Sequence, residues 1–357
     1  MDIVGVLTFL HSFLQFSALS VNVQNRKNGK LYTSRLLECY SICSWLLSVS
    51  FLLYSIFGKN EFPTGNTRLD DTVDFIQFSG IRIVHLVIVT EAFINRHHFA
   101  EVVERVREID RMYVRWLNVD VDNGHLHRCI LRWGTIMAAL YITIESFIII
   151  AQIFSKESFL SVYFILYLVP FFIVGLRYFQ IACFLSVIRQ RLVKLVLTLH
   201  ELDLLHGIQK LNHDLSTDFV SSEYPQYRGT CLENADLHRL NIIRDLYNRL
   251  WELLLLLNEN YGYSICANVI NDFISITANF YWVFLNFYSN SSTREEILQT
   301  TSGVLLCVPH IFNLVTFTLL CDDLSLKTTE LALGLHRIEW NVDNDNHNTA
   351  GRHLSMV

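Results

Sequence analysis

The segment ILRWGTIMAALYITIESFIIIAQIF (Ile130–Phe154) contains 25 residues, of which only Arg132 and Glu145 are charged. An α-helix needs about 20 mainly apolar residues to cross the hydrocarbon core of a bilayer. The segment is long enough and apolar enough to do so. It therefore predicts a membrane-spanning helix.

Five further segments have the same character. They are Leu37–Phe57, Val73–Asn95, Phe159–Ile188, Tyr261–Tyr288 and Leu298–Cys321. The chain of 357 residues is 52% hydrophobic and 17% charged, whereas a soluble domain is about a quarter charged. The sequence predicts an all-α polytopic protein of the lipid bilayer, with six spanning helices and no room for a sizeable soluble domain.

The first residues, Met1–Leu19, are apolar but short, and they include His11 and Gln15. They lack the basic start and small-residue cleavage site of a signal peptide. We expect a helix that lies in the membrane interface, and a seventh span is the alternative.

The distribution of Lys and Arg predicts the orientation of the chain. With the segment before Leu37 in the cytoplasm, six spans place 21 of the 28 basic residues on the cytoplasmic side and four on the other side. The remaining three lie within spans. Cytoplasmic loops are enriched in Lys and Arg, so we expect a cell-membrane protein with both termini in the cytoplasm. The net charge of -6 argues against nucleic acid as a partner.

Asn290-Ser291-Ser292 is a glycosylation sequon in the predicted outer loop between the last two spans. Asn290 is therefore a candidate glycosylation site. The alternative is that the sequon is unused, because it lies close to the membrane.

Apolar residues continue at heptad spacing beyond three of the spans. They are Leu185, Ile188, Leu192, Leu195, Leu199 and Leu202; Leu237, Leu240, Ile243, Tyr247, Leu250 and Leu254; and Leu324, Thr328, Leu331, Leu335 and Ile338. Such stripes bury against other helices, and we expect one cytoplasmic bundle; stripes lying flat on the membrane are the alternative. The expected regions are 1–36, 37–188 (four spans), 189–258 (cytoplasmic), 259–321 (two spans) and 322–357 (extension and polar tail).

Motifs of catalysis are absent from the sequence: it contains no HExxH, GxGxxG, P-loop or GxSxG. The eight cysteines include no CxxC pair, and the His97-His98 and His125-x-His127 groups have no further ligands that we can place. We expect neither an enzyme nor a bound cofactor or metal.

Four charged residues within the predicted spans form two pairs of opposite sign at similar depth. Arg82 and Glu145 each lie about 15 Å along their helices at the α-helical rise, and Arg177 and Asp272 both lie deeper. A charge in the bilayer is usually paired or functional. We predict Arg82–Glu145 and Arg177–Asp272 pairs, which could equally serve helix packing alone.

The outer halves of the spans are rich in aromatic side chains with a few polar groups. Small-molecule sites combine these two features, although ordinary packing is the alternative for each residue. The candidate ligand-binding residues are Gln77, Arg82, Glu145, Tyr163, Tyr167, Trp282 and His310.

The run LYNRLWELLLLLNENYGYSI (Leu246–Ile265) resembles the most recognisable internal segment of insect gustatory receptors. The matching positions are Leu246, Tyr247, Leu250, Trp251, Leu254, Asn258, Tyr261, Gly262 and Ser264. The resemblance covers roughly residues 1 to 338. It implies a subunit of a ligand-gated cation channel that detects small-molecule tastants and assembles as a homo- or hetero-tetramer with related subunits.

The resemblance also implies seven helices, a cytoplasmic amino terminus, a cytoplasmic anchor domain and an outer ligand pocket among the second to sixth helices. The seventh helix of that family lines the pore and carries Thr-Tyr, five residues, then Gln-Phe. No such pattern follows Ile338, so we expect a chain without this helix.

Two other classes are alternatives. Asp110-Arg111-Met112-Tyr113 is superficially similar to the DRY motif of G-protein-coupled receptors, but it lies inside an amphipathic helix after the second span. A transporter would show repeated, interrupted helices, and the sequence has no such repeat.

Overall fold

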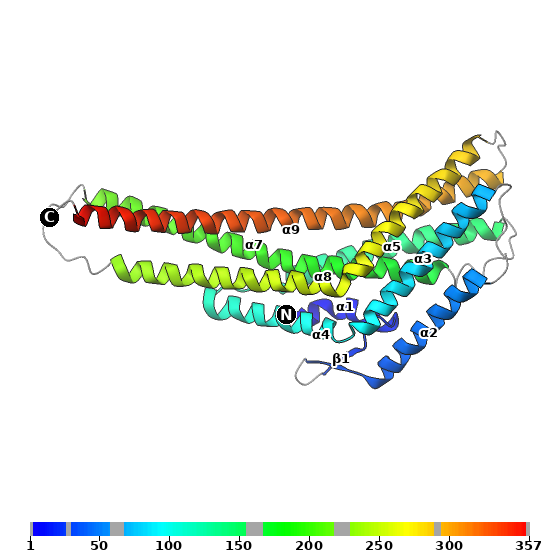
Figure 1. Cartoon of the computed structure of the whole chain (residues 1–357), viewed down its shortest axis with the longest axis horizontal. Coiled ribbons are helices and arrows are strands. Elements are labelled where there is room, and N and C mark those ends of the chain that lie inside the picture. The colour runs from blue at the N-terminus through cyan, green and yellow to red at the C-terminus, as the bar shows by residue number, and fades with distance from the viewer. Residues whose placement is uncertain are drawn as a thin grey trace. The chain divides into compact units, whose positions relative to one another are not determined.

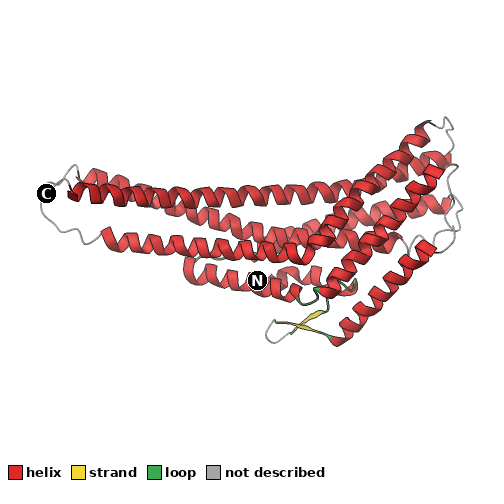
Figure 2. Cartoon of the chain, viewed as in Figure 1, coloured by secondary structure: helices red, strands yellow, loops and turns green. Residues whose placement is uncertain are grey.

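The computed structural model describes residues 3–25, 30–57, 68–154, 167–217, 229–288 and 294–354. These residues are almost entirely helical, and the strands are confined to one short antiparallel pair (Figure 2). The elements are α1 (Ile3–Phe16), β1 (Asn22–Gln24), β2 (Leu31–Thr33), α2 (Arg35–Phe57), α3 (Arg68–Ile94), α4 (His98–Met112), the π-helix η1 (Tyr113–Leu117), α5 (Asn123–Phe154), α7 (Val169–Thr217), α8 (Gly229–Tyr288) and α9 (Arg294–Leu354). The predicted all-α polytopic fold is confirmed.

Five helical segments among the described residues are long and apolar enough to cross a membrane. They are Arg35–Tyr54, Phe75–Ile94, Asn123–Ile150, Val169–Leu202 and Thr300–His336. The sixth predicted span, Tyr261–Tyr288, is helical within α8 but does not reach this level of apolarity.

The composition of α8 explains this difference. One face of the helix is polar and buried, and it includes Asn268, Asp272 and Asn279. Exposed positions on the same segment are apolar, such as Phe273 and Phe280. Because the polar face is covered by protein, the average hydropathy of this segment understates how apolar its outer surface is.

The chain divides into two compact units. Unit 1 comprises Met1–Arg105, Asp122–Phe184 and Leu255–Leu319, and unit 2 comprises Val106–Val121, Leu185–Leu254 and Leu320–Val357. Within unit 1, α2 and α3 lie side by side (Figure 1). The predicted division of the chain into five regions stays a prediction.

The amino-terminal helix α1 packs against α5 within unit 1. Its apolar residues Ile3, Leu7, Leu10 and Leu14 are buried by protein. The predicted interfacial position of this helix stays a prediction. With 14 residues, α1 is shorter than the roughly 20 that a span requires.

Helix α5 begins where Asp122 caps its first turn. The Asp122 carboxylate accepts hydrogen bonds from the backbone N–H groups of Gly124 and His125, at 3.0 and 3.1 Å. These bonds satisfy donors that have no partner inside the helix. The bond from His125 contributes most to lowering the pKa of Asp122, because it stabilises the ionised carboxylate.

Several residues of each heptad stripe are buried within unit 2, whereas Leu237 is exposed. Leu195 on α7, Ile243 and Leu250 on α8, and Leu331 on α9 are each almost completely covered. A methyl group placed at Gly334 would lie 2.6 Å from a terminal carbon of Leu199, so α7 and α9 are in close contact there. The helix α9 then continues through the polar tail to Leu354.

Candidate functional site

A buried ion pair joins α3 to α7 in unit 1. The Nη2 atom of Arg177 lies 2.5 Å from Oε2 of Glu91, and both side chains are buried. The same guanidinium donates from Nε to Ser264 Oγ at 3.0 Å and from Nη1 to Gln180 Oε1 at 2.9 Å. A buried ion pair is stable only when further hydrogen bonds satisfy its remaining atoms, and this pair has them.

Two residues of α8 complete the arrangement. Ser264 donates its backbone N–H to Glu91 Oε1 at 3.3 Å and its hydroxyl to Glu91 Oε2. The ring of Tyr261 lies 4.5 Å from the Arg177 guanidinium carbon, and its hydroxyl accepts from Gln180 at 3.2 Å. We call Glu91, Arg177, Gln180, Tyr261 and Ser264 the Arg177 network.

Asp272 on α8 has different partners. Its Oδ1 lies 2.6 Å from His310 Nδ1, and its Oδ2 accepts a hydrogen bond from the Tyr178 hydroxyl at 2.6 Å. This corrects the predicted Arg177–Asp272 pair, because Arg177 is paired with Glu91. Consecutive helical residues project about 100° apart, so Tyr178 faces Asp272 while Arg177 faces α3.

Aromatic rings from α5, the start of α7 and α9 gather around Phe171. The ring centroid of Phe171 lies 4.9 Å from that of Tyr141, 5.7 Å from that of Tyr167 and 5.4 Å from that of His310. Asn313, one turn after His310 on α9, donates from Nδ2 to the Tyr141 hydroxyl at 2.9 Å. We call Tyr141, Tyr167, Phe171, His310 and Asn313 the His310 cluster.

The Tyr141 ring approaches α7 closely at Gly175. A methyl group at Gly175 would lie 2.5 Å from the Tyr141 hydroxyl oxygen and 2.6 Å from the ring carbon that bears it. Real side chains do not tolerate such a distance, so the position of Tyr141 requires a residue without a Cβ atom here.

Some polar atoms on the α9 side of the His310 cluster are buried without a hydrogen-bond partner in the part of the chain that the structure describes. They are His310 Nε2 and Asn313 Oδ1. Both side chains are almost completely covered, at 1% and 3% exposure. Buried polar atoms nearly always have a partner, which can be a bound molecule. These two acceptors therefore mark the His310 cluster as a candidate ligand site.

A polar seam runs between α3 and α8 in the same unit. Gln77 donates to the Asn279 amide oxygen at 3.3 Å, and the Asn95 amide donates to the Asn260 carbonyl at 3.1 Å. The sequence reasoning overlooked this seam, Glu91 and Asn313. The three-or-four-residue spacing of Asn260, Ser264, Asn268, Asn271, Ser275 and Asn279 could have revealed the face of α8 that forms it.

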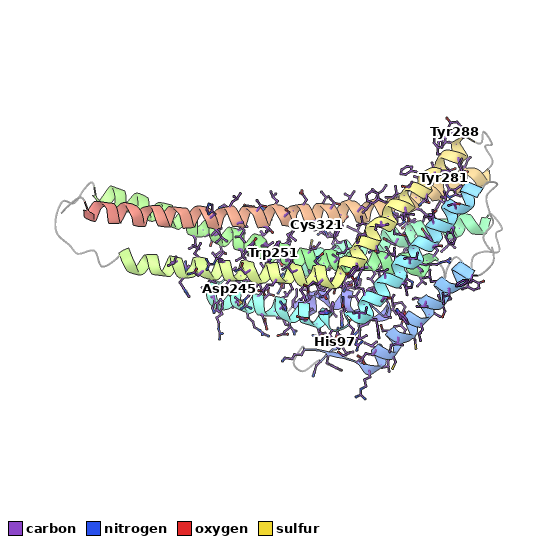
Figure 3. All side chains as sticks on the ribbon, viewed as in Figure 1. His97, Asp245, Trp251, Tyr281, Tyr288 and Cys321 are labelled. Atoms are coloured by element: carbon purple, nitrogen blue, oxygen red, sulfur yellow. The ribbon has the colours of Figure 1, made fainter. Side chains whose placement is uncertain are left out.

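The other predicted site residues have different outcomes. His310 and Tyr167 belong to the His310 cluster, and Gln77 belongs to the seam. Arg82 and Glu145 are both buried, and their pairing stays a prediction. Trp282 is half-buried, 5.6 Å from the ring of Tyr281, which is labelled near the end of α8 in Figure 3. Two candidates, Tyr163 and Asn290, lie outside the described residues.

Metal ligation has no support in the described ranges, where no group of three or more His, Cys, Asp or Glu side chains could hold an ion.

Comparison with known proteins identifies the family of the chain. Residues 3–352 match the family model described as "7tm Chemosensory receptor". The chain is also 34% identical, over 329 residues, to a Drosophila melanogaster protein named "Putative gustatory receptor 2a". That similarity covers 89% of this chain and 74% of the fly protein.

Proposed function

The chain belongs to the 7tm chemosensory receptor family, and we propose that it is a subunit of a ligand-gated cation channel in the plasma membrane that detects small-molecule tastants. The relative named as a gustatory receptor supports the choice of tastants over other chemical signals. The polytopic helical fold supports a role as a membrane-embedded subunit.

The observation that carries the proposal is the His310 cluster. It combines three aromatic rings with two buried acceptors, His310 Nε2 and Asn313 Oδ1, that lack partners among the described residues. Ligand sites are mainly apolar, with a few placed polar groups that set orientation. The ligand would lie against these rings and hydrogen bond to α9.

The orientation and assembly belong to the same proposal. The excess of Lys and Arg on one side supports a cytoplasmic amino terminus. Apolar side chains of unit 2 that remain exposed, such as Trp251, Leu326 and Leu333, offer surface for related subunits in a homo- or hetero-tetramer.

Recording currents from cells that express the chain, alone and with a related subunit, tests this function. We expect tastant-evoked cation current that persists when G-protein signalling is blocked. Current only in the presence of the related subunit would show that this chain works as part of a mixed assembly. A response abolished by the block would favour a G-protein-coupled receptor, and solute uptake without current would favour a transporter.

A further inference from the structure

We propose that the His310 cluster binds an organic cation with N–H donors, that is, a protonated amine attached to an apolar body. The proposal rests on the proposed function in one respect, because it takes this cluster as the ligand site. It adds the chemical class of the ligand, which follows from the charges and acceptors around the cluster.

The first acceptor is His310 Nε2. Because Asp272 lies 2.6 Å from Nδ1, the ring proton is assigned to Nδ1, where it is donated to the carboxylate. Nε2 then carries a lone pair. The Tyr178 hydroxyl donates to the other Asp272 oxygen at 2.6 Å. This bond holds the carboxylate in place, and the carboxylate in turn sets the orientation of the His310 ring.

The second acceptor is Asn313 Oδ1. The amide nitrogen of Asn313 is occupied by the Tyr141 hydroxyl at 2.9 Å, which leaves the oxygen as the group that can receive a ligand donor. His310 and Asn313 are three residues apart on α9, so they lie on the same face of the helix, about one turn apart. An ammonium group carries three donors and can serve both.

The surrounding rings also favour a cation. Phe171 lies within 6 Å of the ring centroids of Tyr141, Tyr167 and His310. The face of an aromatic ring is electron-rich and attracts cations, most strongly where water is excluded. Tyr141, Tyr167 and Phe171 are all buried.

Two acidic residues act on the tyrosines of the cluster. Asp272 and Glu145 both act electrostatically on Tyr141, and Glu145 also acts on Tyr167. The nearby arginine on α7, Arg177, is engaged by Glu91 at 2.5 Å. Asp272 is completely buried, and its partners are the His310 ring and the Tyr178 hydroxyl. A ligand cation would offset the cost of keeping this carboxylate ionised.

Three probes of matched size test the charge preference. They are 2-phenylethylammonium, its neutral analogue 2-phenylethanol and the anion 3-phenylpropionate. The full chain is purified in detergent, and its thermal unfolding midpoint is measured against the concentration of each probe, since a ligand of the folded state raises the midpoint. We expect the cation to bind about tenfold more tightly than the alcohol, and the anion not to bind.

Variants test whether the preference for the cation arises at the His310 cluster. Asp272→Asn should remove the advantage of the cation over the alcohol. If that variant fails to fold, Phe171→Leu tests the same point, because it deletes a ring and leaves every described hydrogen bond of the cluster in place. The matched control is Asp322→Asn, which makes the same change at an exposed position of α9 and should keep the wild-type preference.

Each outcome decides the proposal. Equal affinity for cation and alcohol, or no binding of the cation, overturns it. Tighter binding of the anion also overturns it, because it would mean that His310 is doubly protonated and donates from Nε2. These results are separate from the channel assay. Cation binding without current would contradict the proposed function alone, and tastant-evoked current with no charge preference in binding would contradict the present inference alone.

Discussion

The Arg177 network and the His310 cluster are built from similar materials in the same unit. The Arg177 network joins α3, α7 and α8 through the buried pair of Arg177 and Glu91, and the His310 cluster is held by the contact of the buried His310 of α9 with Asp272 of α8. In the Arg177 network, each nitrogen of the guanidinium and both oxygens of Glu91 have partners. In the His310 cluster, His310 Nε2 and Asn313 Oδ1 have none among the described residues.

This difference indicates two roles for buried polar side chains in a membrane helix bundle: fixing the packing of the helices and binding a ligand. A fully satisfied network fixes the relative positions of α3, α7 and α8, because every alternative arrangement would leave a charge without a partner. An incompletely satisfied cluster retains hydrogen-bonding capacity that a ligand can use. Changes in the first should therefore affect folding most, and changes in the second should affect binding most.

Removing the acid of the Arg177 network should have the largest effect. Glu91→Ala leaves the Arg177 charge buried without its ion-pair partner, which destabilises a protein by about 3–5 kcal/mol. We expect a large fall in the thermal unfolding midpoint and in the yield of folded protein. Glu91→Gln, which keeps the shape and part of the hydrogen bonding, should lose less. If Glu91→Ala unfolds at the wild-type temperature, the network does not hold the helices together.

Crowding the close approach at Gly175 should have the next largest effect. Gly175→Ala places a methyl group where the Tyr141 hydroxyl lies, and overpacking of this kind costs about 1–3 kcal/mol. The displaced Tyr141 would no longer hold Asn313. We expect both a lower unfolding midpoint and weaker binding of 2-phenylethylammonium, measured on one preparation. Gly303→Ala, where the nearest atom is a Val283 methyl group at 3.3 Å, is the control and should leave binding unchanged.

Replacing the second acceptor should affect binding far more than folding. Asn313→Leu removes an unsatisfied oxygen together with a single hydrogen bond, so the free energy of unfolding should change by no more than about 1 kcal/mol. The affinity for 2-phenylethylammonium should fall about tenfold. Titration of the variant by its thermal shift gives both quantities. A stability loss as large as that of Glu91→Ala would remove the distinction between the two regions.

A single hydrogen bond in unit 2 gives the smallest expected effect. The Tyr113 hydroxyl donates to the Arg191 carbonyl at 2.7 Å, and burial raises its pKa well above the usual range, so it remains a donor at physiological pH. Tyr113→Phe should cost about 0.5–1.5 kcal/mol, measured by thermal unfolding, with ligand affinity unchanged. Altered affinity would mean that the His310 cluster is sensitive to changes far along the chain. Binding would then not depend on that cluster alone.

Several elements could be predicted because they depend on local pattern. Continuous apolar runs predicted the segments that form α2, α3, α5, α7 and α9, and heptad spacing predicted residues such as Leu195 and Leu331 that are buried in unit 2. The position of α1 could not be predicted in this way. Its apolar face is equally suited to lipid and to protein, so only the tertiary structure reveals that it packs against α5.

The partners of the buried charged residues show most clearly what the sequence could not predict. Counting residues along a helix gives the depth of a side chain, and this placed Arg177 and Asp272 at similar levels. The count does not give the direction in which the side chain projects or the rotation of each helix in the bundle. Asp272 was therefore expected opposite Arg177, whereas it lies against His310 and Tyr178.

The sequence by itself determined the helical membrane fold, the segments long enough to span and the family, because each follows from composition, periodicity and local motif. Only the tertiary structure decided that Glu91 pairs with Arg177, that Asp272 orients His310, and that two acceptors on α9 lie beside aromatic rings from α5 and α7. These contacts join residues up to about 170 positions apart. Their geometry depends on how each helix is rotated against its neighbours, which no local pattern in the chain encodes.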